Sequence, residues 1–93
     1  MLEPAAVVTL GQGVPGIESI HNIRSRGIQS AVELDLHMEV APDMSVADAH
    51  DLCVQIERDI KTRFPQVTDV VIHIEPQLAA ATTTATAAPP ADS

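Results

Sequence analysis

Aromatic and basic residues are both scarce in this chain of 93 residues. Tryptophan and tyrosine are absent and Phe64 is the single aromatic residue, so any core must be built from aliphatic side chains and methionine. Five basic residues stand against thirteen acidic ones, which gives a formal net charge of −8. A nucleic-acid binder needs basic groups that displace phosphate counterions and aromatic rings on which bases stack. The composition therefore excludes nucleic acid as a partner.

Cysteine and long apolar runs are lacking as well. Cys53 is the one cysteine, which excludes an internal disulfide framework and a four-cysteine zinc site. No apolar run approaches the roughly 20 residues that a membrane helix needs. The N-terminus shows neither the charged nor the apolar region of a signal peptide. We therefore expect a soluble cytosolic chain, and its length allows one small domain.

Composition divides the chain into a folded part, residues 1–76, and a tail, residues 77–93. The tail is rich in Ala, Thr and Pro and has no large apolar residue after Leu78, so it cannot offset its ordering entropy and we predict that it is disordered. A core of this size is marginal on its own. We expect a bound metal or a partner subunit to support it.

The hydrophobic pattern predicts five elements in the folded part. A short helix over Leu2–Leu10 precedes a strand over Ile17–Arg26 and a second strand over Ala31–Val40, where apolar and polar residues alternate. A long helix runs to Arg63, and a last strand covers Val67–Glu75. The predicted fold is an α+β, ferredoxin-like αββαβ arrangement, with two helices on one face of a three-stranded sheet. The other face of the sheet is then left open.

The long helix has a clear beginning and one apolar face. Ser45 followed by Asp48 is a capping-box pattern, and Pro65 stops the helix. A predicted apolar stripe comprises Val46, Ala49, Cys53, Ile56 and Ile60. In the last strand, Val70, Ile72 and Ile74 are predicted to point to the same side.

Histidines and carboxylates occupy the polar faces of the predicted strands. His37 and Asp35 share one such face, and His73 and Glu75 share another, so all four would converge on the open side of the sheet. Imidazole together with carboxylate suits zinc and its first-row neighbours. Solvated surface histidines are the alternative. Cys53 lies three residues after His50 on the long helix and could be a weaker metal ligand, although its favoured role is that of a small buried hydrophobic residue.

Two other functions are not supported by the residues. Gly11, Gly13 and Gly16 have the spacing of a dinucleotide-binding loop, but that loop must follow a strand and open a helix, whereas this one contains Pro15 and leads into a strand. No Ser–His–Asp spacing or enclosed carboxylate pair can be defended. We therefore expect no enzymatic activity.

Several segments together resemble one known family. These are Val14–Gly27 with its His-x-x-Arg-x-Arg motif, Leu34–Val40, Ser45–His50, Phe64–Pro65 and Val70–Pro76. In this order and spacing they resemble the cytosolic C-terminal domain of cation diffusion facilitator transporters. The resemblance covers nearly all of the folded part. It implies a metallochaperone-like αββαβ fold, attached to a six-helix membrane transport domain and placed on the cytoplasmic side of the membrane.

The resemblance also implies a role and a ligand set. In the family two copies form a homodimer, divalent metal binds at the dimer interface, and binding tightens the dimer and favours efflux. The implied ligands are His21, His37, His50, His73 and Glu75, with His50 sharing His73 and Glu75 in a second metal position. Zn²⁺ is the expected metal, with Fe²⁺, Mn²⁺, Co²⁺, Ni²⁺ and Cd²⁺ as alternatives. A structural dimerisation module without tight metal binding and a stand-alone metallochaperone are the alternative functions.

Overall fold

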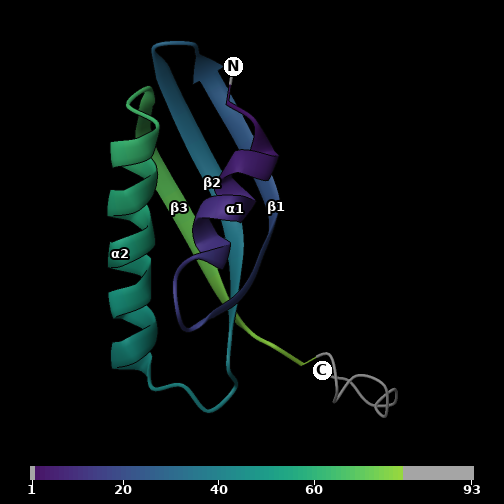
Figure 1. Ribbon diagram of the computed structural model, residues 1–93. Helices are drawn as coiled ribbons and strands as arrows, with labels where there is room; N and C mark the ends of the chain where they lie inside the picture. Colours follow the sequence, from purple (N-terminus) through teal and green to yellow (C-terminus); the bar gives the residue numbers. More distant parts are fainter. Residues whose placement is uncertain (1, 79–93) are drawn as a thin grey trace.

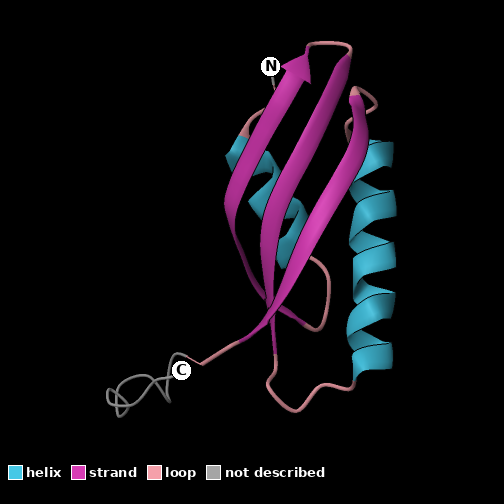
Figure 2. Ribbon diagram, turned by 180° about the vertical axis from the view of Figure 1, so that it is seen from behind, coloured by secondary structure: helices cyan, strands magenta, loops and turns pink. Residues whose placement is uncertain are grey.

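The computed structural model describes residues 2–78, so most of the predicted tail lies outside the described residues. Its elements follow the predicted order: α1 (Pro4–Gln12), β1 (Ile17–Ile28), β2 (Ala31–Val40), α2 (Val46–Arg63) and β3 (Val67–Pro76). Figure 1 shows the two helices in front of the sheet, and the view from behind in Figure 2 shows the sheet face that neither helix covers. The predicted αββαβ fold is confirmed.

Short-range signals explain where the elements begin and end. Pro4 opens α1, two residues later than predicted, because its fixed φ and missing N–H suit a first helical turn. At the start of α2 the Asp48 N–H donates to Ser45 Oγ over 3.0 Å, as the capping pattern predicted. The basic residues Lys61 and Arg63 occupy the last turn of α2, where they complement the helix dipole.

The sheet has the strand order β1-β2-β3 and is mixed. β1 and β2 form an antiparallel hairpin, whereas β3 pairs parallel to β2 after the crossover through α2. The Gln77 N–H still donates to the Val40 carbonyl over 2.8 Å, so sheet-like bonding reaches the first residue of the predicted tail. β2 is therefore the central strand. On each face of the sheet, side chains of β2 lie between those of β1 and those of β3.

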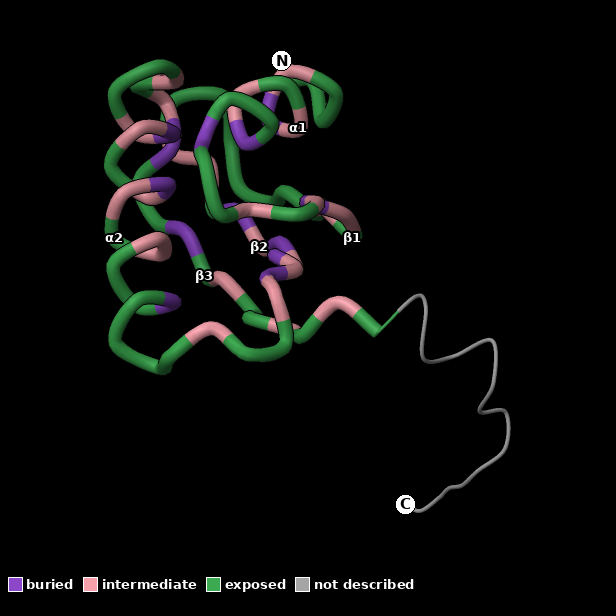
Figure 3. The backbone as a smooth tube through the Cα atoms, turned by 60° about the horizontal axis from the view of Figure 1, so that its bottom comes forward, coloured by how far each residue is buried: buried purple, intermediate pink, exposed green. Residues whose placement is uncertain are grey.

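The core lies between the sheet and the helices. Leu34, Leu36 and Met38 of β2 are at most 1% exposed, and Ile56 and Ile60 of α2 are fully buried. Figure 3 shows the buried stretches of the helices turned towards those of the sheet. Because alternate residues of a strand point to opposite faces, burial of these β2 residues sends Asp35, His37 and Glu39 to the open face.

Two apolar residues are more exposed than the helical and strand patterns predicted. Val46 is 87% exposed, so the apolar stripe of α2 begins at Ala49; the first turn of the helix extends beyond the edge of the core. Ile74 is 43% exposed although its neighbour Ile72 packs against the core, because β3 is an edge strand with no strand beyond it. The spacing of apolar residues therefore identifies the inward face of a helix or strand, but it does not show how far along that face the rest of the fold covers it.

Gly11 fixes the close approach of α1 to β1. It is buried in α1, and a Cβ at this position would collide with Cδ1 of Ile20 in β1. The first glycine of the spacing that imitates a dinucleotide loop therefore serves helix–sheet packing.

Candidate metal centre

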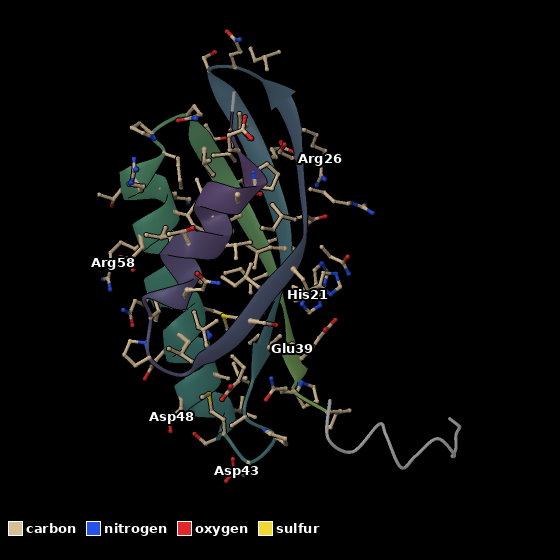
Figure 4. All side chains as sticks on the ribbon, turned by 45° about the vertical axis from the view of Figure 1, so that its right-hand side comes forward. His21, Arg26, Glu39, Asp43, Asp48 and Arg58 are labelled. Carbon is tan, nitrogen blue, oxygen red and sulfur yellow. The ribbon has the colours of Figure 1, made fainter. Side chains whose placement is uncertain are left out.

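Three histidines form a row across the open face of the sheet. The strand register pairs His21 of β1 with His37 of β2, and His37 with His73 of β3. The rings of His21 and His37 lie 5.6 Å apart between centroids, and those of His37 and His73 lie 4.8 Å apart. Figure 4 shows His21 projecting from the sheet on the side away from the helices. The predicted convergence of His37 and His73 is present, with His21 beside them.

A β-bulge places His21 and the arginine that follows it on the same face. Three steps along β1, from His21 to Arg24, oppose two steps along β2, from His37 to Asp35, so β1 holds one extra residue. Asn22 supplies it in the left-handed region with φ of 52°, which asparagine tolerates better than most residues. Without the bulge, His21 and Arg24 would point to opposite sides of the sheet.

Glu75 of β3 contacts two of the three histidines in this row. Its Oε2 accepts a hydrogen bond of 2.5 Å from His37 Nδ1, and its Oε1 lies 3.3 Å from His21 Nε2. The hydrogen bond from His37 and, secondarily, the charges of both imidazoles hold the pKa of Glu75 below its ordinary value. The group is therefore an anionic carboxylate at neutral pH, which is the form that binds a metal.

His21, His37 and Glu75 satisfy the distance requirement for a shared ion. One potential ligand atom from each lies within 4.8 Å of the other two, and the three side chains are between 30% and 38% exposed. Two imidazole nitrogens and one carboxylate oxygen are a ligand set that suits Zn²⁺ and similar metals, with a fourth position left for water or another residue. We call these three residues the His–Glu cluster.

His73 lies next to the His–Glu cluster but turns towards another carboxylate. Its Nε2 is 3.9 Å from Oδ1 of Asp35, and its ring stacks on that of His37. His73 and Asp35 line a hollow of about 240 Å³ together with Asn22, Arg24 and His37. The sequence offered Arg24 only as part of the family motif and did not place it at this hollow, because the bulge that turns it to this face leaves no periodic pattern.

His50 and Cys53 lie away from the cluster in a single chain. Both belong to α2, on the other side of the sheet; His50 is exposed and Cys53 packs against the core. Burial, and then the charge of Glu57, raises the pKa of the Cys53 thiol, which disfavours the thiolate needed for coordination. Among the described residues no hydrogen bond, ion pair or ring contact joins either residue to the His–Glu cluster.

Ser19 and Glu39 extend the polar face beyond the histidines. The Ser19 hydroxyl donates to Glu39 Oε1 over 3.0 Å and lies 3.5 Å from His21 Nδ1. This pair was not identified from the sequence, although Glu39 has the same strand parity as His37. The contact orients one ring nitrogen of His21 and leaves Nε2 directed at Glu75.

The fold and this histidine-rich sheet face place the chain among the cytosolic domains of cation transporters. The family described as "Cation efflux protein, cytoplasmic domain" matches residues 3–77, and the chain belongs to this family. The resemblance to cation diffusion facilitators is thereby confirmed.

Two relatives agree with this assignment by name. Metal tolerance protein C1 of Arabidopsis thaliana is 38% identical over 63 residues, which cover 68% of this chain and 13% of that protein. The cation-efflux pump FieF of Cronobacter sakazakii is 32% identical over 74 residues, which cover 80% of this chain and 24% of the pump. The chain thus spans a quarter or less of the length of these relatives.

A solved structure supports the same conclusion for the fold. The crystal structure of the cytosolic domain of a cation diffusion facilitator family protein superposes with a TM-score of 0.71 at 30% identity, covering 77% of this chain and 86% of that one. Neither helix within residues 2–78 has the length and apolar character required to cross a membrane.

Proposed function

We propose that this chain is a non-catalytic metal sensor of a cation efflux transporter and that it binds a divalent transition metal, with Zn²⁺ as the favoured ion, at the His–Glu cluster. One observation carries the proposal: donor atoms of His21, His37 and Glu75 converge within 4.8 Å on the open sheet face of a cation-efflux domain. His37 and Glu75 would hold the ion, and coordination through His37 Nδ1 would require the proton shared with Glu75 to be released to solvent, so metal binding should release a proton.

The proposal includes a homodimer attached to a membrane transport domain. The open sheet face carries the cluster, and burial of such a face against a second copy would enlarge a small core. A metal that binds the closed arrangement of two copies more tightly than the open one shifts the population towards the closed arrangement by its difference in affinity. Closure would then promote transport by the attached membrane domain.

His50 enters this site only through the second copy. Within one chain the sheet separates α2, which carries His50, from the open face. A His50 ligand shared with His73 and Glu75, as the family resemblance implies, therefore requires a dimer in which α2 of one protomer approaches the open face of its partner. A monomeric variant would retain the His–Glu cluster and lose the contribution of His50.

Calorimetric titration with Zn²⁺ tests the site directly. We expect His37→Ala to weaken binding by at least about tenfold, because loss of even an outer-shell partner of a metal ligand commonly costs 10–100-fold. Asp51→Asn is a matched control, since it changes an exposed polar group of α2 outside the cluster. Equal affinity of the wild type and His37→Ala would refute the site.

Small-angle scattering distinguishes the alternative functions. A sensor contracts on addition of Zn²⁺, whereas a purely structural dimerisation module keeps the same dimensions. A stand-alone metallochaperone would bind Zn²⁺ and transfer it to a partner without any effect on dimer shape. A metal-dependent decrease in radius of gyration that His37→Ala abolishes would support the sensor.

A further inference from the structure

Arg26 holds a carboxylate that could otherwise join the metal site. Its Nη1 lies 3.6 Å from Oδ2 of Asp35, and its Nε lies 3.3 Å from Oε1 of Glu33. The other oxygen of Asp35 faces His73 Nε2 at 3.9 Å. The Asp35 carboxylate, which is 20% exposed, therefore lies between a guanidinium and an imidazole of the histidine row.

Asp35 and the two nearby imidazoles are groups that could bind a cation. In this structure the positive charge next to Asp35 is supplied by an arginine side chain. Asp35, His37 and His73 line the hollow of about 240 Å³, and Arg24 also lines it. The permanent charge of the guanidinium satisfies Asp35 without coordination chemistry. Removing that charge would leave a half-buried carboxylate next to two imidazoles, an arrangement that favours capture of a metal ion.

The number of carboxylates in a site influences which metal it prefers. Imidazole suits Zn²⁺, Fe²⁺ and Ni²⁺, whereas carboxylate-rich sites suit Mn²⁺ and other oxygen-seeking ions. With Asp35 bound to Arg26, the histidine row is left with one carboxylate, Glu75. The metal centre is then nitrogen-rich.

On these contacts we propose that Arg26 determines metal specificity: it withholds Asp35 from coordination and so disfavours oxygen-seeking ions such as Mn²⁺. This role rests on the proposed function, because it presupposes that metal binds at the His–Glu cluster. Arg26 does not touch the ion in this scheme; it positions Asp35. The bulge at Asn22 is what brings Arg24 and Arg26 to the metal-binding face.

The test is the ratio of the dissociation constants for Mn²⁺ and Zn²⁺, measured by calorimetry on Arg26→Gln. General electrostatic effects act on both ions alike, so the ratio isolates the freed carboxylate. We expect the preference for Zn²⁺ over Mn²⁺ to fall by about tenfold, because the freed carboxylate adds an oxygen ligand that suits Mn²⁺ better than Zn²⁺, and loss of an outer-shell partner typically changes metal affinity by about 10–100-fold. Arg58→Gln removes the same charge from α2, on the far side of the molecule from His21 (Figure 4), and should leave the ratio unchanged.

Three further variants separate this mechanism from others. Arg26→Lys retains the charge and should retain most of the wild-type preference, and Arg26→Gln combined with Asp35→Asn should restore the wild-type ratio. Asp35→Asn alone should leave the Zn²⁺ affinity within about twofold of wild type, and this measurement does not depend on the folding of an Arg26 variant. Loss of Zn²⁺ binding in Asp35→Asn would show that Asp35 is already a ligand and would overturn the proposal.

The outcomes also separate this inference from the proposed function. If Zn²⁺ binding depends on His37 but Arg26→Gln and Arg58→Gln give the same ratio, the specificity role is wrong and the metal sensor stands. If the wild type binds neither ion, or if His37→Ala binds as the wild type does, the proposed function is wrong and the specificity role is wrong with it.

Discussion

Glu75 is the residue that turns a row of histidines into a candidate site. It lies on the edge strand β3, yet its two oxygens contact His37 on the central strand and His21 on the far strand. A side chain one methylene shorter would start from the same backbone position with less reach. The choice of glutamate at this position therefore matters for linking all three strands.

The lowered pKa of Glu75 gives a testable dependence of stability on pH. A carboxyl group whose pKa is lower in the folded state stabilises that state above its unfolded pKa, about 4.3, and this contribution is lost as pH falls through the folded pKa. In metal-free protein, Glu75→Gln should melt below the wild type near neutral pH. The gap should close at strongly acidic pH.

Thermal melting across this range checks the expectation for Glu75. Glu18→Gln, at an exposed residue of β1, is the control and should show a smaller gap. A melting difference for Glu75→Gln that is the same at neutral and strongly acidic pH would contradict the assignment of the pKa shift to the contacts with His37 and His21.

Cys53 should behave as a packing residue. Burial raises the pKa of its thiol, so little thiolate is present at neutral pH and reaction with a disulfide reagent should be slower than for a free cysteine. Cys53→Ala should cost about 1 kcal/mol of stability and leave Zn²⁺ affinity unchanged. Titration of the variant checks this, and a loss comparable to that of His37→Ala would identify Cys53 as a ligand.

At the scale of elements, the bulge in β1 controls the composition of the open face. An uninterrupted β1 would alternate strictly, so that His21 and Arg24 could not both face His37. The bulge makes both do so, and it brings Arg26 to the same side as Glu33 and Asp35. The metal centre and its arginine partners thus depend on one residue with a left-handed backbone.

Substitution of Asn22 tests this dependence. Asn22→Val should destabilise the fold by about 1–2 kcal/mol, because a β-branched residue is strained at positive φ, and should weaken Zn²⁺ binding as the bulge distorts. Asn22→Gly should preserve binding, since glycine adopts this conformation freely. Chemical denaturation and Zn²⁺ titration give the two readouts.

Ser25→Val provides the matched control for the bulge. Ser25 is an exposed residue of the same strand without positive φ, where valine is well tolerated. Equal stability of Asn22→Val and Ser25→Val would show that the left-handed position is not needed.

At this scale the sequence predicted the elements well and the site less completely. Alternation in β2 placed Leu34 and Leu36 inside and His37 outside, because a strand's two faces are encoded by neighbouring residues. The same reasoning could not place Arg24 and Arg26, since a bulge leaves no periodic trace. His21 was assigned only through the family resemblance, and its actual neighbours come from the register.

For the whole molecule, charge is distributed unevenly along the sheet direction. The five basic residues lie on the later part of β1 and the last turns of α2, at the same end of the sheet. They are Arg24, Arg26, Arg58, Lys61 and Arg63. Figure 4 shows Asp43 and Asp48 at the opposite end, away from Arg26 and Arg58. When two such chains come together, their acidic side chains should repel each other most strongly at the end of the sheet that lacks basic side chains.

This repulsion predicts a salt effect on the proposed dimer. Without metal, raising ionic strength from about 0.02 M to 0.5 M should shrink the radius of gyration, because salt shortens the screening length to a few ångströms. Metal-loaded protein should respond less, since bound cations already offset the acidic charge. Small-angle scattering measures both, and an equal response of the two forms would argue against charge repulsion as the cause of opening.

The sequence by itself determined the order of elements, the aliphatic core, the acidic charge and the polar strand faces. These features depend on composition and on residues a few positions apart, where periodicity is informative. Only the tertiary structure decided which donors meet. Glu75 reaches across β2 to His21, Asp35 binds Arg26, and α2, which carries His50, lies on the other side of the sheet from these residues. These contacts depend on strand register, a bulge and long-range pairing, which residues distant in sequence fix together when the chain folds.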